Sequence, residues 1–189
     1  MQYEIAKEFT VDCAHRVYNQ KLDDMEEKCK YIHGHTYTIK IFLTSETLDN
    51  DMVLDFNRLN AIKSFLDKFL DHRLLVSVHD SDLLETLNML LRTLGSCKAE
   101  GMSKTMTLIS LNAYVLIRCL DEQHVLKLHH DNVLINSVTI VPCNTTSESL
   151  AQWLHNVCQK LLPNVTVSRV VVKETPKSQA CYYANHFNR

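Results

Sequence analysis

The sequence lacks a long hydrophobic run. Nowhere do about 18 apolar residues follow one another, which excludes a membrane-spanning helix. Residues 1–8 mix charged and apolar side chains without the core of a signal peptide, so we expect a cytosolic protein. The sequence also lacks an excess of positive charge. With 20 Lys and Arg against 22 Asp and Glu, its formal net charge is −2, so neither nucleic acid nor an anionic membrane is an expected partner.

The cysteines lack any C-x-x-C pair, so neither a zinc ribbon nor a thioredoxin-like site is expected. There are seven of them, and an odd number in a chain of 189 residues also argues against an oxidised framework. We interpret most of them as reduced thiols that pack as small hydrophobes. Their positions are Cys13, Cys29, Cys97, Cys119, Cys143, Cys158 and Cys181.

What is present is typical of one globular domain. The chain is 46% hydrophobic and 22% charged, and 189 residues are too few for two domains of ordinary size. Apolar residues alternate with polar ones over 3–15 and again over 37–43, which predicts two strands. The polar, aperiodic segment 16–30 between them is predicted to be a loop.

Two segments have helical periodicity. One runs from Phe56 to about Leu70 after a candidate cap at Asp55, and the other covers 150–161 after a capping box over 145–148. A last strand is predicted over 165–172. We interpret 76–141 as an insertion that contains a helical turn at 83–91 and a β-hairpin formed by 107–118 and 125–140. The chain 1–189 is thus predicted to be one α+β domain with an antiparallel sheet.

His33 and His35 stand two apart in the motif H-G-H. On a strand such residues project from the same face, so both imidazoles can reach one ion. His15 is the only histidine of the first predicted strand, and it lies on the same face of that strand as the alternating apolar residues. If the two strands pair, three imidazoles converge, and three such ligands with an open fourth position are typical of a catalytic zinc. The alternative is a chance H-x-H in a chain with ten histidines.

Other candidate residues are weak signals one by one. Cys29 precedes His33 by four residues, and a thiol beside a divalent cation ionises readily, but it could equally be a fourth zinc ligand or a surface thiol. Asp71 can orient His72 for proton transfer, although both residues also suit the end of a helix. Glu148 could simply be the glutamate of the capping box, and Glu174 could simply be a solvated residue at the end of a strand.

The motifs as an ordered set are more specific. They are F-T-x-x-x-A-H (Phe9 to His15), C-x-x-x-H-G-H-x-Y (Cys29 to Tyr37), L-D-F (Leu54 to Phe56), L-D-H-R-x-L (Leu70 to Leu75), N-T-T-x-E-x-L-A-x-W (Asn144 to Trp153) and V-K-E-T (Val172 to Thr175). Together they resemble the 6-pyruvoyl-tetrahydropterin synthase family, and within it the 6-carboxy-tetrahydropterin synthases of queuosine biosynthesis. The spacing of three residues between the cysteine and the H-G-H motif resembles that of the bacterial carboxy-pterin enzymes.

The resemblance implies a tunnelling fold, which is a four-stranded antiparallel sheet backed by two helices. It implies homotrimers or homohexamers with active sites at subunit interfaces. The implied substrate is a pterin triphosphate, 7,8-dihydroneopterin triphosphate, and the implied product is 6-carboxytetrahydropterin, with 6-pyruvoyl-tetrahydropterin as the alternative. Other pterin enzymes of this fold, and a non-catalytic zinc- or pterin-binding protein, are further alternatives.

The resemblance also implies roles for single residues. By position, three histidines match the zinc ligands, a thiol and a carboxylate–imidazole pair match the catalytic residues, and two glutamates match the substrate pocket. Candidates for binding the triphosphate are Arg16, Lys30, Arg73 and Lys173. The zinc ligands are His15, His33 and His35, the catalytic residues are Cys29, Asp71 and His72, and the substrate-binding residues are Glu148 and Glu174.

Overall fold

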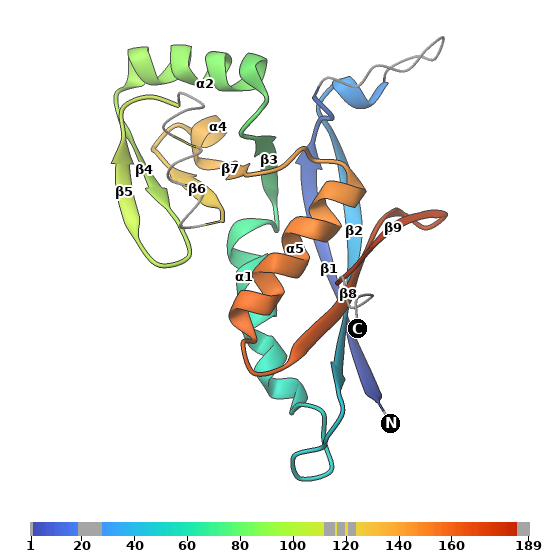
Figure 1. Cartoon of the computed structure of the whole chain (residues 1–189). Coiled ribbons are helices and arrows are strands. Elements are labelled where there is room, and N and C mark those ends of the chain that lie inside the picture. The colour runs from blue at the N-terminus through green and yellow to red at the C-terminus, as the bar shows by residue number, and fades with distance from the viewer. Residues whose placement is uncertain (1, 19–27, 112–115, 117–119, 121–123, 185–189) are drawn as a thin grey trace. The chain divides into compact units, whose positions relative to one another are not determined.

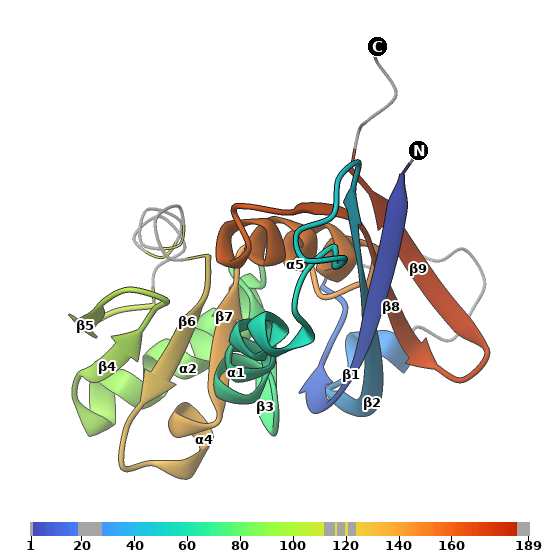
Figure 2. The same cartoon turned by 90° about the horizontal axis from the view of Figure 1, so that it is seen from below.

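A computed structural model describes residues 2–18, 28–111, 116, 120 and 124–184 (Figures 1 and 2). The element order confirms an α+β protein. The strands are β1 (Tyr3–His15), β2 (His33–Ser45), β3 (Arg73–Ser77), β4 (Cys97–Glu100), β5 (Thr105–Leu108), β6 (Leu126–His129), β7 (Val138–Val141), β8 (Thr166–Thr175) and β9 (Ser178–Tyr183). The helices are α1 (Asn60–Phe69), α2 (Ser81–Leu94), α4 (Val133–Asn136) and α5 (Ser147–Leu161), with short 3-10 turns η1 (Lys28–Lys30) and η2 (Phe56–Leu59).

The strands form a sheet that is larger than the sequence predicts. The described residues give nine strands in the order β5-β4-β6-β7-β3-β1-β2-β8-β9, so the prediction of four strands is wrong. The prediction of a purely antiparallel sheet is also wrong, because β3 pairs in parallel with both β1 and β7. The predicted antiparallel pattern holds for β2 with β8 and for β8 with β9.

The chain divides into two compact units, the first formed by 1–11, 35–68 and 147–189. In this unit α1 and α5 lie on the same face of β2 and β8 (Figures 1 and 2). Both helices bury the apolar stripes that the sequence predicts, and Phe65 of α1 meets Trp153 of α5 with ring centroids 6.1 Å apart. The N-terminus of the 3-10 turn before α1 is capped by Asp55, whose carboxylate accepts a hydrogen bond from the Asn57 amide at 2.9 Å.

The second unit consists of 12–34 and 69–146, and it contains the whole predicted insertion. The apolar face of α2, formed by Leu84, Leu87 and Leu91, is buried in one core with side chains of the strands β3 to β7. Strand β7 is buried at every position, which is typical of a strand covered on both faces.

The predicted hairpin between 107–118 and 125–140 is wrong. Within the described part of the insertion, β5 pairs with β4, while β6 pairs with β4 and β7. Much of 107–118 lies outside the described residues, and Leu116, which is described, is helical and fully buried. The predicted helical turn at 83–91 is a helix of 14 residues. Alternation alone could not choose between these pairings, because several short strands offer similar patterns.

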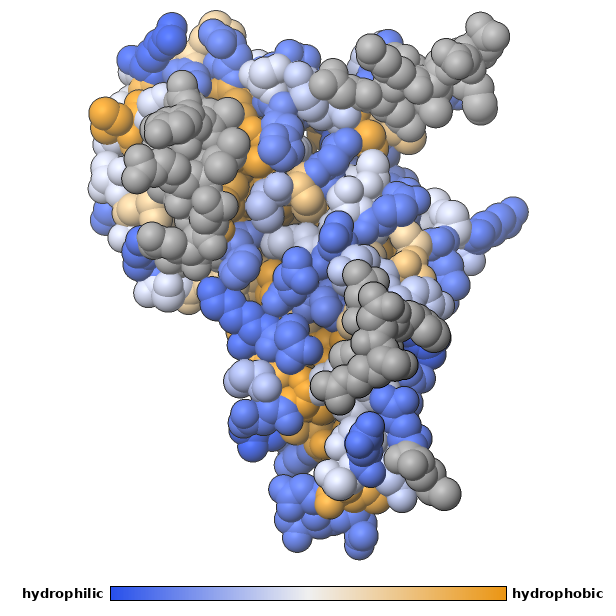
Figure 3. Space-filling view, viewed as in Figure 1, coloured by the Kyte–Doolittle hydropathy of each residue, from blue (hydrophilic) through white to orange (hydrophobic). Residues whose placement is uncertain are grey.

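The cysteines of the described ranges are free thiols, as the sequence predicts. They number six, and Cys119 lies outside the described residues. None of the helices within those ranges is long and apolar enough to cross a membrane. Hydrophobic side chains reach the surface around the connection from β2 to α1, where Leu48, Met52 and Phe56 are exposed (Figure 3).

Candidate functional site

The first two predicted zinc ligands lie together. His15 is the last residue of β1 and its side chain is fully buried, and His33 is the first residue of β2. Their ring centroids are 4.6 Å apart with an interplanar angle of 53°. A fully buried histidine needs partners for its ring nitrogens, because an unsatisfied polar group in the interior costs free energy.

Each of these two rings has its Nδ1 atom engaged by the backbone. His15 Nδ1 lies 2.7 Å from the carbonyl oxygen of Thr145, and His33 Nδ1 lies 2.7 Å from that of Tyr31. A carbonyl oxygen can only accept, so both Nδ1 atoms donate, and in the neutral ring Nε2 is then the nitrogen with the acceptor lone pair. Metal-bound histidines usually donate their other ring N–H to a carboxylate or a backbone carbonyl in this way.

The third predicted ligand, His35, lies beside Glu174. Its Nε2 atom is 3.4 Å from Glu174 Oε1, and its ring meets Tyr37 edge-on with centroids 5.6 Å apart. The carboxylate of Glu174 also accepts hydrogen bonds from Tyr37 Oη at 3.3 Å and from Ser147 Oγ at 3.5 Å. Because β2 carries His33 and His35 two residues apart, both point to the same face of the strand, as the sequence predicts.

The four side chains form a group that could hold a metal ion. His15, His33, His35 and Glu174 each offer one ligand atom, and these atoms all lie within 4.8 Å of one another. Imidazole nitrogens and a carboxylate are donors that Zn²⁺ accepts, and the hydrogen bonds at Nδ1 supply the supporting shell of such sites. The residues therefore fit zinc. The sequence assigned Glu174 to the substrate pocket and did not place it beside the histidines.

The predicted proton-relay pair also forms a defined arrangement. His72 Nδ1 lies 2.9 Å from Asp71 Oδ2, and Asp71 Oδ1 accepts the Asp12 amide at 3.1 Å. The His72 amide donates to the Asp12 carbonyl oxygen at 2.6 Å. His72 has a left-handed backbone with φ of 55°, which is uncommon for a residue other than glycine and is frequent at functional sites. The imidazole is 79% exposed, so its Nε2 atom faces solvent.

The remaining predicted residues lie near the surface. Cys29 is in the 3-10 turn Lys28–Lys30 and is half-buried, and its carbonyl oxygen accepts the Val17 amide at 2.8 Å. Cys29 is not a member of the group that could hold a metal. Glu148 lies in the first turn of α5 and is exposed, and a carboxylate there also interacts favourably with the helix dipole. Their predicted roles in catalysis and substrate binding stay predictions.

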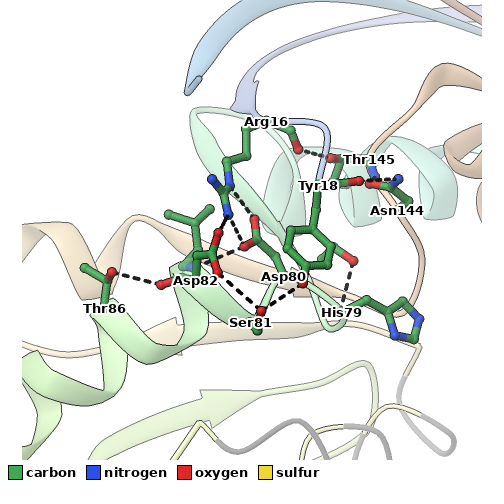
Figure 4. A network of polar contacts seen from close by, with 11 residues as sticks. Arg16, Tyr18, His79, Asp80, Ser81, Asp82, Thr86, Asn144 and Thr145 are labelled. Atoms are coloured by element: carbon green, nitrogen blue, oxygen red, sulfur yellow. Dashed lines mark hydrogen bonds and ion pairs between the residues drawn. The ribbon is translucent and has the colours of Figure 1, made fainter. Parts of the chain in front are cut away.

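Sequence reasoning missed the residues that surround His15. Arg16, which the sequence offers only as a candidate triphosphate ligand, is bound by the carboxylates of Asp80 and Asp82, and Thr145 contacts its backbone (Figure 4). Asp80 forms hydrogen bonds with the Arg16 guanidinium that raise the pKa of Arg16 further above its ordinary value. Asp80 caps α2 in the structure, and a cap does not show a partner 64 positions away in the sequence.

One cavity of about 560 Å³ lies elsewhere in the first unit and contains none of the predicted site residues. Its lining includes Leu48, Val53, Arg58, Leu161 and Pro163. Its charged lining residues are Asp49 and Arg58.

A family model described as 6-pyruvoyl tetrahydropterin synthase matches residues 4–185. A protein of Aquifex aeolicus named 6-carboxy-5,6,7,8-tetrahydropterin synthase is 34% identical over 92 residues, which cover 42% of this chain. The match spans just 56% of the Aquifex protein's own length.

Two solved structures are similar to this chain over almost its whole length. An uncharacterised protein of Wolinella succinogenes is 30% identical, with a TM-score of 0.76 over 97% of this chain and 98% of that one. The 6-pyruvoyl tetrahydropterin synthase of Plasmodium vivax gives a TM-score of 0.59 at 15% identity, over 98% of this chain and 99% of that one. At this low identity the second likeness shows the fold alone.

Proposed function

Because the chain belongs to the 6-pyruvoyl tetrahydropterin synthase family, we propose that it is a zinc-dependent lyase acting on 7,8-dihydroneopterin triphosphate. The proposed product is 6-carboxy-5,6,7,8-tetrahydropterin, the product named for the Aquifex relative. The reaction would place the protein in queuosine and 7-deazaguanine biosynthesis.

One observation carries the zinc proposal. His15 and His33 both donate Nδ1–H to backbone carbonyl oxygens, so in the neutral rings Nε2 is the nitrogen that can act as a metal ligand. His35 is the third proposed zinc ligand, and its ligand atom lies within 4.8 Å of the other two, with Glu174 in the same group. A bound zinc would supply Lewis acidity toward the hydroxyl oxygens of the substrate side chain, so that neighbouring protons leave more easily.

The chain's own residues would move those protons. Asp71 holds His72 by its Nδ1–H, which leaves Nε2 as the atom that accepts and returns a proton at the exposed side. Cys29 would act as the thiolate base in the same relay. Proton removal from the side chain would lead to loss of triphosphate, and in the carboxy-pterin reaction to cleavage of the side chain with release of acetaldehyde.

Substrate binding is assigned to glutamates. The carboxylate of Glu174 can accept two parallel hydrogen bonds from the guanidine-like edge of a pterin, a strong charge-assisted contact. Tyr37 and Ser147 hold this carboxylate through its two oxygens, which orients it. Glu148, at the start of α5, is proposed to line the same pocket.

The test is a product analysis on protein with known metal content. Mass spectrometry of reactions started from 7,8-dihydroneopterin triphosphate should detect 6-carboxytetrahydropterin, and the purified protein should hold about one zinc per subunit. Formation of 6-pyruvoyl-tetrahydropterin instead would favour the second candidate reaction, which the same residues can support. Zinc binding without turnover would favour a non-catalytic pterin-binding protein.

We further propose a cytoplasmic homotrimer or homohexamer. The edge strand β9 offers unpaired backbone groups on one side of the described sheet, and such edges are usually covered by another chain or closed into a barrel. Barrel closure would bring residues of neighbouring subunits together around each pterin site.

A further inference from the structure

A network of polar contacts lies directly beside His15 in the second unit. The next residue, Arg16, binds Asp80 through two nitrogens: Nε donates to Asp80 Oδ2 at 2.6 Å, and Nη2 donates to Asp80 Oδ1 (Figure 4). Nη2 also donates to Asp82 Oδ2 at 3.1 Å. A two-point contact between guanidinium and carboxylate fixes the orientation of both groups.

Asp80 is unusual among these residues because its carboxylate is buried. Its side chain is 1% exposed, whereas that of Asp82 is 72% exposed. A buried carboxylate is costly unless it is paired and hydrogen-bonded, and Arg16 supplies the charge. Asp80 also caps α2, since its Oδ1 accepts the Leu83 amide at 3.1 Å. The pair therefore ties the residue after His15 to the start of a helix.

Thr145 connects this network to the imidazole of His15. The Thr145 side chain is fully buried, and its Oγ1 donates to the carbonyl oxygen of Arg16 at 2.6 Å. The carbonyl oxygen of the same threonine accepts Nδ1–H of His15 at 2.7 Å. Asn144 adds a third link, because its Nδ2 donates to the Tyr18 carbonyl oxygen at 3.2 Å.

We propose that Thr145 and Asp80 are positioning residues that hold His15 ready to bind the metal. Thr145 fixes its carbonyl oxygen against the imidazole by anchoring its own hydroxyl to the backbone of Arg16, and Asp80 holds Arg16 through its guanidinium. The ring of His15 is then kept in the tautomer that presents Nε2. This inference rests on the proposed function in one respect, namely that His15 is a metal ligand.

The inference gives the insertion a role. Asp80 belongs to the predicted insertion 76–141, and it lies 64 positions from Arg16 in the sequence. The insertion would thus supply a carboxylate that supports the metal site, in addition to extending the sheet. Loss of an outer partner of a metal-bound histidine typically weakens metal binding by about 10- to 100-fold.

Zinc affinity tests the proposal without relying on turnover. The dissociation constant would be measured by competition with a chromophoric chelator for the wild type, Thr145→Val and Thr145→Ser. Thr145→Val keeps the shape but loses the hydroxyl, and we expect it to bind zinc roughly 10-fold more weakly or worse. Thr145→Ser keeps the hydroxyl and should bind zinc like the wild type.

A second pair of variants tests the carboxylate. Asp80→Asn keeps a capping group for α2 but leaves the charge of Arg16 without its buried partner, so zinc should bind more weakly. Asp82→Asn is the matched control, because it removes only an exposed contact of the same guanidinium, and it should leave zinc affinity unchanged. If Thr145→Val does not fold, as judged by circular dichroism, this pair decides.

The outcomes separate the two proposals. The positioning role is overturned if Thr145→Val binds zinc as tightly as the wild type. If Thr145→Val does not fold, equal zinc affinity in Asp80→Asn and Asp82→Asn overturns it. In either case, weaker zinc binding by His15→Ala would leave the proposed function standing. A wild type that does not bind zinc, or His15→Ala that binds it as well as the wild type, overturns both.

Discussion

The carboxylate of Asp71 and the imidazole of its neighbour His72 share a 2.9 Å hydrogen bond. The other oxygen of Asp71 accepts the Asp12 amide, so the carboxylate cannot turn freely. The left-handed backbone of His72 places the ring beside this fixed partner. The pair is an oriented carboxylate–imidazole unit, which is the arrangement that proton transfer requires.

The relay predicts a specific pattern of rate losses. Cys29→Ala and His72→Ala should each lose about 10²- to 10⁴-fold in turnover while they retain zinc, because each removes a group that moves protons. The double variant should lose little more than either alone, since residues that act as one unit are not additive. Turnover and zinc content would be measured on the same preparations. Zinc lost from Cys29→Ala would make Cys29 a ligand, and zinc retained with full activity would remove it from the mechanism.

Glu174 is predicted to bind substrate even though it lies in the metal group. Glu174→Gln keeps the size of the side chain but loses its charge, so the pterin should bind about 10- to 100-fold more weakly, the loss expected for a charge-assisted hydrogen bond. Zinc affinity should stay close to that of the wild type. Calorimetry with a pterin and chelator competition measure the two quantities. A loss of zinc with normal pterin binding would instead assign Glu174 to the metal.

Thiol labelling should follow the exposure of the cysteines. Cys29 is half-buried and Cys181 is exposed, so both should react quickly with iodoacetamide near neutral pH in the zinc-free protein. Burial raises the pKa of Cys143 to about 12, so few thiolates form there and labelling should be slow. Peptide mass spectrometry would measure the extent of labelling at each cysteine. Cys29→Ser is the control, because it should lose the label at position 29 alone. Rapid labelling of the buried cysteines would contradict the fold. These are Cys13, Cys97 and Cys158.

Alkaline pH should destabilise the protein through Cys13. Burial, and then the charges of Asp71 and Asp12, raise the pKa of this thiol from 9.0 to about 12. Between pH 9 and 12 the unfolded state therefore loses a proton that the folded state keeps. Stability supplied by the neutral thiol is complete below about pH 9 and falls as pH rises, by at most roughly 1.4 kcal/mol per pH unit. Denaturant unfolding at several pH values should show a shallower decline for Cys13→Ala. Cys181→Ala, at an exposed thiol, should keep the decline of the wild type.

The edge of the sheet predicts assembly. The strand β9 pairs with β8 on one side only within the described sheet, and uncovered edges favour association with another chain. Light scattering at micromolar concentration should give the mass of a trimer or a hexamer. A single monomeric species would contradict the proposed barrel and with it the shared active sites.

Local patterns in the sequence were sufficient to predict β1, β2, α1, α5 and β8, whereas β9 was not predicted. The alternation over 3–15, the helical stripes near 56–70 and 150–161, and the H-G-H motif each report a period that neighbouring residues set among themselves. The strand face onto which His15, His33 and His35 project follows from the same local geometry, which is why the sequence alone predicts three ligands. The motifs in order were specific enough to indicate the family.

The tertiary structure decided what depends on distant partners. Three features join segments that are far apart in the chain: the parallel pairing of β3 with β1 and β7, the order of the nine described strands, and the position of Glu174 beside His35. No local period in the sequence encodes which distant segments pair. The same holds for the buried carboxylate of Asp80, which the sequence analysis does not single out. Its pairing with Arg16 becomes visible only when the fold brings the two together, because a charge removed from water must find its partner in space and not in sequence.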